Sequence, residues 1–213
     1  MFSISSATAE KGYTLIELSI TLAVISVLIV GGLSGIQSIM NIVKVSEQIK
    51  VVAKLNARIS LLYRGTTAGV TQLQVAQMGG WDTDRVTIAS NLATIKSAFG
   101  TREVILPNAN NDIGDIKANS GFQYFIKSVP QVACTDLAMG LRNFSYAMQI
   151  NQADTANEVE QASATWAAAT TPQTAGGTLN FSVLGARCNP SVVSGSGAST
   201  VAPSFDFIIA LRP

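Results

Sequence analysis

A single acidic residue, Glu17, lies at the start of a long stretch without charge. From Leu18 to Val43 the chain runs for 26 residues without Asp, Glu, Lys or Arg. As an α-helix at about 1.5 Å per residue, this stretch would be about 39 Å long, enough to cross a hydrocarbon layer of about 30 Å. Because an acidic side chain inside a bilayer costs roughly 3 kcal/mol or more, Glu17 is a candidate functional residue whose partner has to be found.

The residues before this stretch are polar, which reverses the order found in a secretory signal peptide. The first 12 residues, MFSISSATAEKG, end in Gly12, and the sequence YTLIE follows directly. This arrangement resembles the class III signal of type IV prepilins and pseudopilins. The resemblance implies that a prepilin peptidase cuts after Gly12 and methylates the new amino terminus at Tyr13. Glu17 then becomes the fifth mature residue, the assembly glutamate of that family.

This region also has other interpretations. An ordinary membrane anchor or secretory signal could contain Glu17 by chance and be cut near Ser34. Basic residues also follow the apolar stretch, and the positive-inside rule alone would then leave the C-terminal part in the cytoplasm. They are Lys44, Lys50, Lys54, Arg58 and Arg64, against Lys11 and the initiator amine before it. We favour the prepilin interpretation because the motif is specific and the cysteines agree with export.

Beyond Val43 apolar residues continue at helical spacing, with charged residues on the other side. The apolar set is Ile42, Val45, Ile49, Val52, Leu55, Ile59 and Leu62. We therefore predict one helix over residues 13–64, whose second half packs under a globular head. Gly31, Gly32 and Gly35 interrupt the apolar half, where each costs about 1 kcal/mol relative to Ala. They are either a packing surface for neighbouring helices or a place where the helix can unwind.

Composition bounds the rest of the chain and its chemistry. With 213 residues, 47% of them hydrophobic, the chain has room for a leader over 1–12, the long helix and one head over 65–213. It has no histidine, which removes the commonest general base and most zinc sites. From Gly65 onward there are eight basic and ten acidic residues. This part of the chain therefore lacks the net positive charge of a nucleic-acid-binding domain. We expect neither an enzyme nor a cofactor, metal or nucleic-acid partner.

The segment Asn108–Asp115 has the residue types of a calcium loop but not their order. Ile113 stands where such a loop needs Gly, and Asn119 stands in place of the bidentate Glu. We interpret this segment as a polar turn.

The chain contains two cysteines, Cys134 and Cys188. In an exported protein an isolated pair usually forms a disulfide, which we predict here, with two buried reduced thiols as the alternative. Cys134 stands at the start of a predicted helix, with Thr135 and Asp136 as candidate caps.

The head pattern predicts an α+β fold with an antiparallel sheet. Helices are predicted at Thr71–Met78 and Asp84–Phe99, and an exposed helix at Glu158–Ala168. Enrichment in β-branched and aromatic residues predicts strands at Glu103–Leu106, Phe122–Ser128, Phe144–Ile150, Leu179–Leu184 and Phe205–Leu211. The Ser/Gly-rich stretch Asn189–Pro203 is predicted to be a surface loop.

Three landmarks in the head resemble the type IVb pilins. Leu62-Tyr63 precedes a loop containing Gly65, Ala133-Cys134 begins a helix, and Cys188 precedes a final strand. The resemblance implies a major pilus subunit that forms a homopolymer, with a prepilin peptidase, an inner-membrane assembly platform and an ATPase as partners. It also implies location in the inner membrane before assembly and in an extracellular pilus afterwards. A minor pilin, a type II secretion pseudopilin, a DNA-uptake pilin and a non-polymerising anchored receptor or adhesin remain alternatives.

Overall fold

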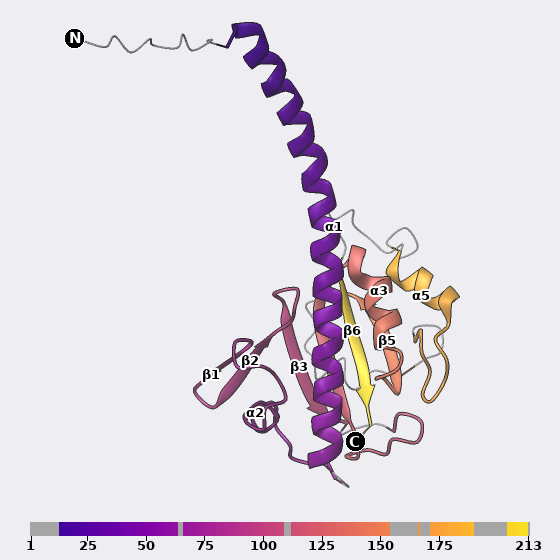
Figure 1. Ribbon diagram of the computed structural model, residues 1–213. Coiled ribbons are helices and arrows are strands. Elements are labelled where there is room, and N and C mark those ends of the chain that lie inside the picture. The colour runs from indigo at the N-terminus through magenta and orange to yellow at the C-terminus, as the bar shows by residue number, and fades with distance from the viewer. Residues whose placement is uncertain are drawn as a thin grey trace, which may run out of the picture. The chain divides into compact units, whose positions relative to one another are not determined.

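The computed structural model describes residues 13–63, 66–108, 112–153, 166, 171–189 and 204–212, without the side chains of residues 33 and 34. By its internal contacts the chain divides into two compact units, Met1–Met40 and Asn41–Pro213. The boundary falls inside the first helix. The second half of that helix therefore belongs to the same unit as the sheet (Figure 1).

Helix α1 (Leu15–Leu62) runs for 48 residues, which agrees with the predicted continuous helix. Every described side chain from Leu15 to Met40 is exposed. The helix stays regular through Gly31, Gly32 and Gly35, and a Cβ added at any of them would meet nothing within 4 Å. The apolar half therefore has no partner of its own among the described residues of its unit.

The second half of α1 is amphipathic, as the apolar spacing predicts. Val45, Val52, Leu55 and Ile59 are buried, whereas Lys50 and Arg58 on the other side are exposed. The buried stripe is shorter than predicted, because its two ends remain in solvent: Ile42 is 59% exposed and Leu62 is 49% exposed. One polar residue, Gln48, is fully buried within this stripe.

A six-stranded antiparallel sheet forms the centre of the second unit, in the order β1-β2-β3-β4-β6-β5. The strands are β1 (Val86–Ala89), β2 (Leu92–Lys96), β3 (Arg102–Pro107), β4 (Phe122–Pro130), β5 (Ala147–Gln152) and β6 (Ser204–Leu211). The last strand of the chain, β6, inserts between β4 and β5, so residues from both ends of the head share the central core.

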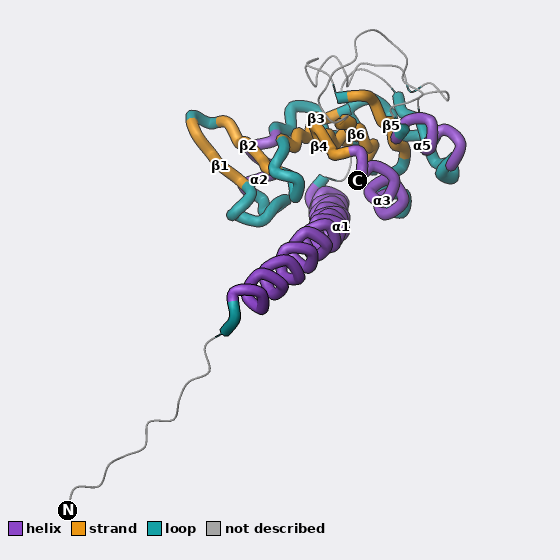
Figure 2. The backbone as a smooth tube through the Cα atoms, turned by 90° about the horizontal axis from the view of Figure 1, so that it is seen from above, coloured by secondary structure: helices purple, strands orange, loops and turns teal. Residues whose placement is uncertain are grey.

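The main core lies on one face of this sheet, and several helices contribute to it. They are α1, α2 (Gln72–Gln77) and α3 (Gln131–Leu141), and a fourth helix, α5 (Phe181–Cys188), lies beside α3 and adds Leu184 and Cys188 to the same core. Viewed from above, the second half of α1 and α3 lie on the same side of the strands (Figure 2). The opposite face carries Val104, Phe125 and Ile208, which pack with Leu106 and Trp166.

The predicted helix over Asp84–Phe99 is wrong, because this segment forms the β1–β2 hairpin. Its loop consists of Ser90 and Asn91, which have φ values of 48° and 63°. Both central residues of a type I′ turn need positive φ, and such a turn matches the twist of the flanking strands. The β-branched residues on each side then pair across the hairpin.

The predicted strand over Leu179–Leu184 is also wrong, because α5 begins at Phe181. The side chain of Asn180 accepts hydrogen bonds from the backbone N–H groups of Ser182 (3.0 Å) and Val183 (3.2 Å), and this capping starts the helix. Helix α3, in contrast, begins at Gln131, directly after Pro130, and has no side-chain cap. Thr135 and Asp136 therefore lie inside α3 and do not cap it.

Other predicted elements agree with the structure. The strands at Glu103–Leu106, Phe122–Ser128 and Phe205–Leu211 correspond to β3, β4 and β6, and the helix at Thr71–Met78 corresponds to α2. The strand predicted from Phe144 begins at Ala147. Apart from Trp166 and Asn189, the predicted helix at Glu158–Ala168 and the predicted loop at Asn189–Pro203 lie outside the described residues.

Candidate functional site

The start of α1 is fixed by Thr14. Its hydroxyl accepts a hydrogen bond from the backbone N–H of Glu17 (3.3 Å), and its carbonyl accepts from Glu17 (3.1 Å) and Leu18 (3.2 Å). This is the geometry of an N-cap, and Glu17 holds the third helical position, where a capping box has its acidic residue. The helix thus begins two residues after the predicted cleavage site. Gly12 itself lies outside the described residues.

Glu17 is exposed, and its carboxylate has no hydrogen-bond or ion-pair partner within the described part of the chain. Tyr13 is also exposed, and within the described residues no hydrogen bond or ion pair joins it to Glu17. A negative charge in the first turn interacts favourably with the helix dipole. Glu17 therefore stabilises the helix start locally, while its carboxylate can still accept a cation from elsewhere.

The remaining polar groups in the first turns of α1 are satisfied within the helix. The hydroxyls of Ser19, Thr21 and Ser26 donate to the carbonyls of Ile16 (2.8 Å), Leu18 (2.9 Å) and Leu22 (2.7 Å). Among the described helices, α1 alone is long and apolar enough to cross a membrane by length and composition, and its most apolar part is not buried at all. Glu17 is therefore the polar residue of these first turns whose side chain has no hydrogen-bond partner among the described residues.

In the head, Cys134 of α3 is bonded to Cys188 of α5, which confirms the predicted disulfide. The two Cα atoms are 5.7 Å apart, and both residues are buried in the main core. Because the bond closes a loop of 54 residues, the chain-entropy model assigns it about 4 kcal/mol of stabilisation. It holds together the two helices that flank β5 and β4.

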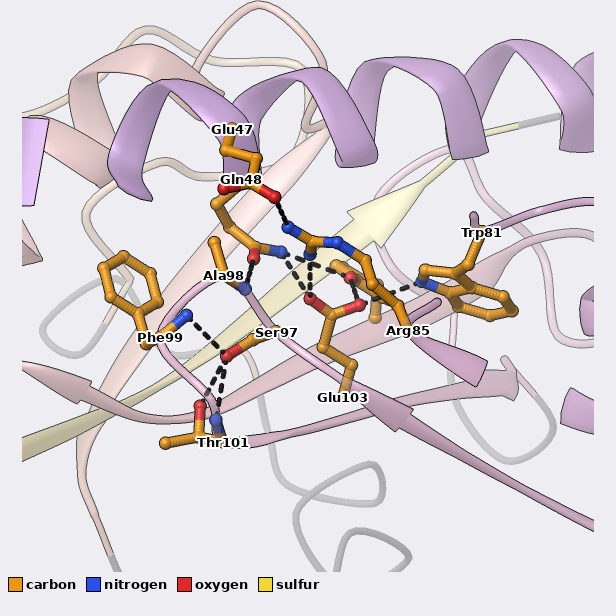
Figure 3. A network of polar contacts seen from close by, with 10 residues as sticks. Glu47, Gln48, Trp81, Arg85, Ser97, Ala98, Phe99, Thr101 and Glu103 are labelled. Carbon is orange, nitrogen blue, oxygen red and sulfur yellow. Dashed lines mark hydrogen bonds and ion pairs between the residues drawn. The ribbon is translucent and has the colours of Figure 1, made fainter. Parts of the chain in front are cut away.

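A buried carboxylate, Glu103 of β3, forms a polar centre that the sequence analysis missed. It accepts hydrogen bonds from Nε2 of Gln48 (2.7 Å), from Nε1 of Trp81 (2.9 Å) and from the hydroxyl of Tyr124, and Nη1 of Arg85 lies 4.0 Å away (Figure 3). Burial raises the pKa of the Glu103 carboxyl, although these donors and Arg85 oppose the rise. Four segments of the head converge on this one group.

A weak signal for this centre was present in the sequence. Gln48 interrupts the apolar stripe of α1 between Val45 and Val52. Glu103 lies two residues before Ile105 and so shares its inward-facing side of the predicted strand. A polar residue at each of two core positions indicates a buried pair. The two residues are 55 positions apart, so only the fold shows that they meet.

The segment Asn108–Asp115 agrees with the interpretation as a polar turn where it is described. Asp112 accepts from Nζ of Lys117 (2.8 Å) and from the backbone N–H of Ala118 (2.9 Å). The described residues contain no cluster of three or more side chains suited to binding a metal.

This geometry defines a protein with one exposed, membrane-length N-terminal helix joined to a disulfide-bonded α+β head. The family profile described as "Prokaryotic N-terminal methylation motif" matches residues 8–33, which include Gly12, Tyr13 and Glu17. No curated protein sequence matches the chain. The motif match agrees with the prepilin interpretation of the N-terminal region.

Solved structures extend the likeness to the head. TcpA, a type IV pilin from the Vibrio cholerae El Tor biotype, is similar with 14% identity, over 78% of this chain and 98% of that one, at a TM-score of 0.51. A type IV b pilin from Salmonella typhi matches with 16% identity, over 78% of this chain and 96% of that one, at a TM-score of 0.45. The chain therefore combines the N-terminal methylation motif with an α+β fold similar to that of a type IV pilin.

Proposed function

We propose that this chain is the major structural subunit of a type IVb-like pilus and polymerises through its N-terminal helix. The observation that carries the proposal is the first half of α1, in which every described side chain is exposed and Glu17 alone is charged. Such an apolar surface is stable only in lipid or against other helices. A filament for adhesion, aggregation or conjugative mating supplies those helices from neighbouring subunits.

Processing follows from the same segment. A prepilin peptidase cuts between Gly12 and Tyr13 and methylates the Tyr13 amine. Thr14 supports this assignment, because its cap starts α1 at Leu15, two residues after the proposed cut. The mature subunit then carries a cation at Tyr13 and an anion at Glu17, one helical turn apart.

During assembly, the apolar half of α1 leaves lipid and packs against the apolar helices of other subunits. Hydrophobic burial alone therefore gives little preference for one axial position of the helix over another. A charge pair does favour one axial position, because its two partners must meet. The Tyr13 amine of an incoming subunit meets Glu17 of the subunit already docked, in a dry bundle where an unpaired charge is heavily penalised. This contact fixes the axial position of one helix against the next.

The proposal places the protein in the inner membrane first and in an extracellular pilus afterwards. An inner-membrane platform with a cytoplasmic ATPase would extract each subunit. Gly31, Gly32 and Gly35, beside which a Cβ would find only open space, would serve as a packing surface for neighbouring helices or as a place where α1 unwinds in the filament.

Electron microscopy of sheared surface material, combined with intact-mass analysis of its subunits, tests this function. A major pilin predicts abundant filaments composed mainly of a chain of residues 13–213 with a methylated amino terminus. A trace amount in filaments made of another protein would indicate a minor pilin. Short periplasmic assemblies without surface filaments would indicate a pseudopilin, and a chain found only in membranes would indicate an anchored adhesin.

A further inference from the structure

The apolar face of α1 does not by itself define where the helix lies along the sheet. Its buried apolar residues Val45, Val52, Leu55 and Ile59 are spaced by one or two helical turns. Apolar residues also continue beyond both ends of this set. A shift by one helical turn, about 5.4 Å, would therefore again place apolar side chains against the sheet. Hydrophobic burial is non-directional and would change little.

Gln48 is the exception to this repeating pattern. It is fully buried, and both ends of its amide are engaged. Its Nε2 donates to Oε1 of Glu103 on β3 (2.7 Å), and its Oε1 accepts from the backbone N–H of Ala98 in the β2–β3 turn (2.8 Å) (Figure 3). Moving Gln48 away would leave the buried carboxylate of Glu103 short of a donor and the part-buried N–H of Ala98 without its acceptor, which is costly.

Residues one turn away along α1 cannot replace both bonds. Val45, Val51 and Val52 offer no polar side-chain atom. Lys44 could donate to the carboxylate of Glu103, but an ammonium group has no acceptor for the N–H of Ala98. We propose that Gln48 is the residue that fixes the register of α1 on the head, because it hydrogen-bonds to Glu103 and to Ala98 at the same time.

The receiving side is held in place by groups outside α1. Trp81 (2.9 Å) and the Tyr124 hydroxyl both donate to Oε2 of Glu103, leaving Oε1 toward Gln48. Arg85, 92% buried at its side chain, lies between Glu103 and Glu47 of α1, so it adds a second polar link between this site and the helix. The carboxylate is therefore a fixed receptor, and buried polar pairs of this kind are known to set register between packed helices.

One consequence rests on the proposed function. In a filament, the register of α1 on the head determines how far the head stands from Glu17 along the same helix. A shift by one turn would mismatch the heads while the Tyr13–Glu17 contacts were kept. The register itself is a property of the single chain and can be measured without any filament.

The test uses the full chain in detergent micelles, with spin labels carried by unnatural amino acids at positions 50 and 136 so that the disulfide stays intact. Both positions are exposed, one on α1 and one on α3. Pulsed electron resonance then measures the distance between the labels. Gln48→Leu should give a second distance, displaced by about 5 Å, and Ala98 should lose its protection from hydrogen exchange. Val52→Ala, which removes buried volume from the same face, should keep a single distance and a protected Ala98.

A single unchanged distance in Gln48→Leu, with Ala98 still protected, would overturn the proposal. If Gln48→Leu does not fold, the exchanged pair Gln48→Glu with Glu103→Gln decides. In the double variant the amide at position 103 donates to the carboxylate at position 48, which can still accept from Ala98. The parent distance should therefore be recovered, whereas Gln48→Glu alone should not recover it. Recovery in neither, or a parent distance in both, would contradict the assignment.

Discussion

Gly140 of α3 lies directly against Ile49 of α1. A Cβ at position 140 would stand 2.0 Å from Cδ1 of Ile49 and 2.8 Å from its Cγ1. A glycine inside a helix costs about 1 kcal/mol relative to alanine, so its presence marks a place where two helices approach too closely for any side chain. Through the Cys134–Cys188 bond, this contact also ties α5 to α1.

Replacing Gly140 by alanine should therefore destabilise the head. The added methyl group has to displace Ile49 from the core, and overpacking of this kind costs about 1–3 kcal/mol. Gly185 is a matched control, because it also lies in a helix, α5, and a Cβ there would meet nothing within 4 Å. Gly185→Ala should be neutral or stabilising in chemical unfolding, and equal effects of the two variants would contradict the close approach.

Removing the disulfide should lower the stability of the head without affecting processing. Cys134→Ser should reduce the free energy of unfolding by about 2–5 kcal/mol, measured by thermal or chemical unfolding, and reductant should have the same effect on the parent chain. Cleavage after Gly12 should continue, because the peptidase acts at the other end. Free alkylation of both thiols in native, unreduced protein would contradict the bond seen between α3 and α5.

Glu103 should give the head an unusual dependence on pH. Burial raises the pKa of this carboxyl above its ordinary value of 4.5, so the folded chain binds the proton more tightly than the unfolded chain does. The stability that this group contributes is fully present below pH 4.5 and is lost as the pH rises through the raised pKa. From pH 4.5 upward, the unfolding free energy of the parent chain should fall relative to that of Glu103→Gln.

Asp82 provides a control of the opposite sign. Its hydrogen bond and charge interaction with Lys54 lower its pKa from 3.8, so its contribution is present above pH 3.8 and is lost as the pH falls. Because Asp82 is exposed, that contribution is small. Asp82→Asn should leave the slope above pH 4.5 unchanged, and a parallel pH profile for Glu103→Gln and the parent would show that Glu103 is not the group responsible.

The turn at Ser90 should be open to stabilisation. Ser90 has a φ of 48°, which glycine adopts at lower cost than other residues. Ser90→Gly should raise the unfolding free energy by up to about 1 kcal/mol, whereas Ser90→Val should lower it because a β-branched residue is strained there. Lower stability for Ser90→Gly than for Ser90→Val would contradict the hairpin over residues 86–96.

The sequence was most informative where one residue type or one period dominates. The uncharged run after Glu17 predicts the first half of α1, and runs of β-branched and aromatic residues predict β3, β4 and β6. The β1–β2 hairpin was missed because its turn, Ser90-Asn91, lacks the glycine that usually marks a type I′ turn. Helix α5 was missed because Leu179, Phe181 and Val183 alternate with polar residues, as in a strand, although Asn180 before Phe181 offered a capping signal.

The candidate site was also only partly predictable from the sequence. Glu17 is evident from the sequence because it breaks a local pattern, and Thr14 three residues earlier completes a capping motif. Gln48 and Glu103 each break a local pattern too, but their pairing depends on the sheet order that brings β3 beneath α1. Contacts of this range are set by tertiary structure and have no local signature.

The proposed assembly contact is tested most directly by Glu17→Val in a strain that carries no other copy of the subunit. Expression, membrane insertion and cleavage after Gly12 should stay close to normal, because the apolar helix is kept, while surface filaments should be absent from sheared material by electron microscopy. Ser26→Val, which removes a hydroxyl already satisfied by Leu22 (2.7 Å), should assemble normally. Abundant, regular filaments from Glu17→Val cells would contradict the account.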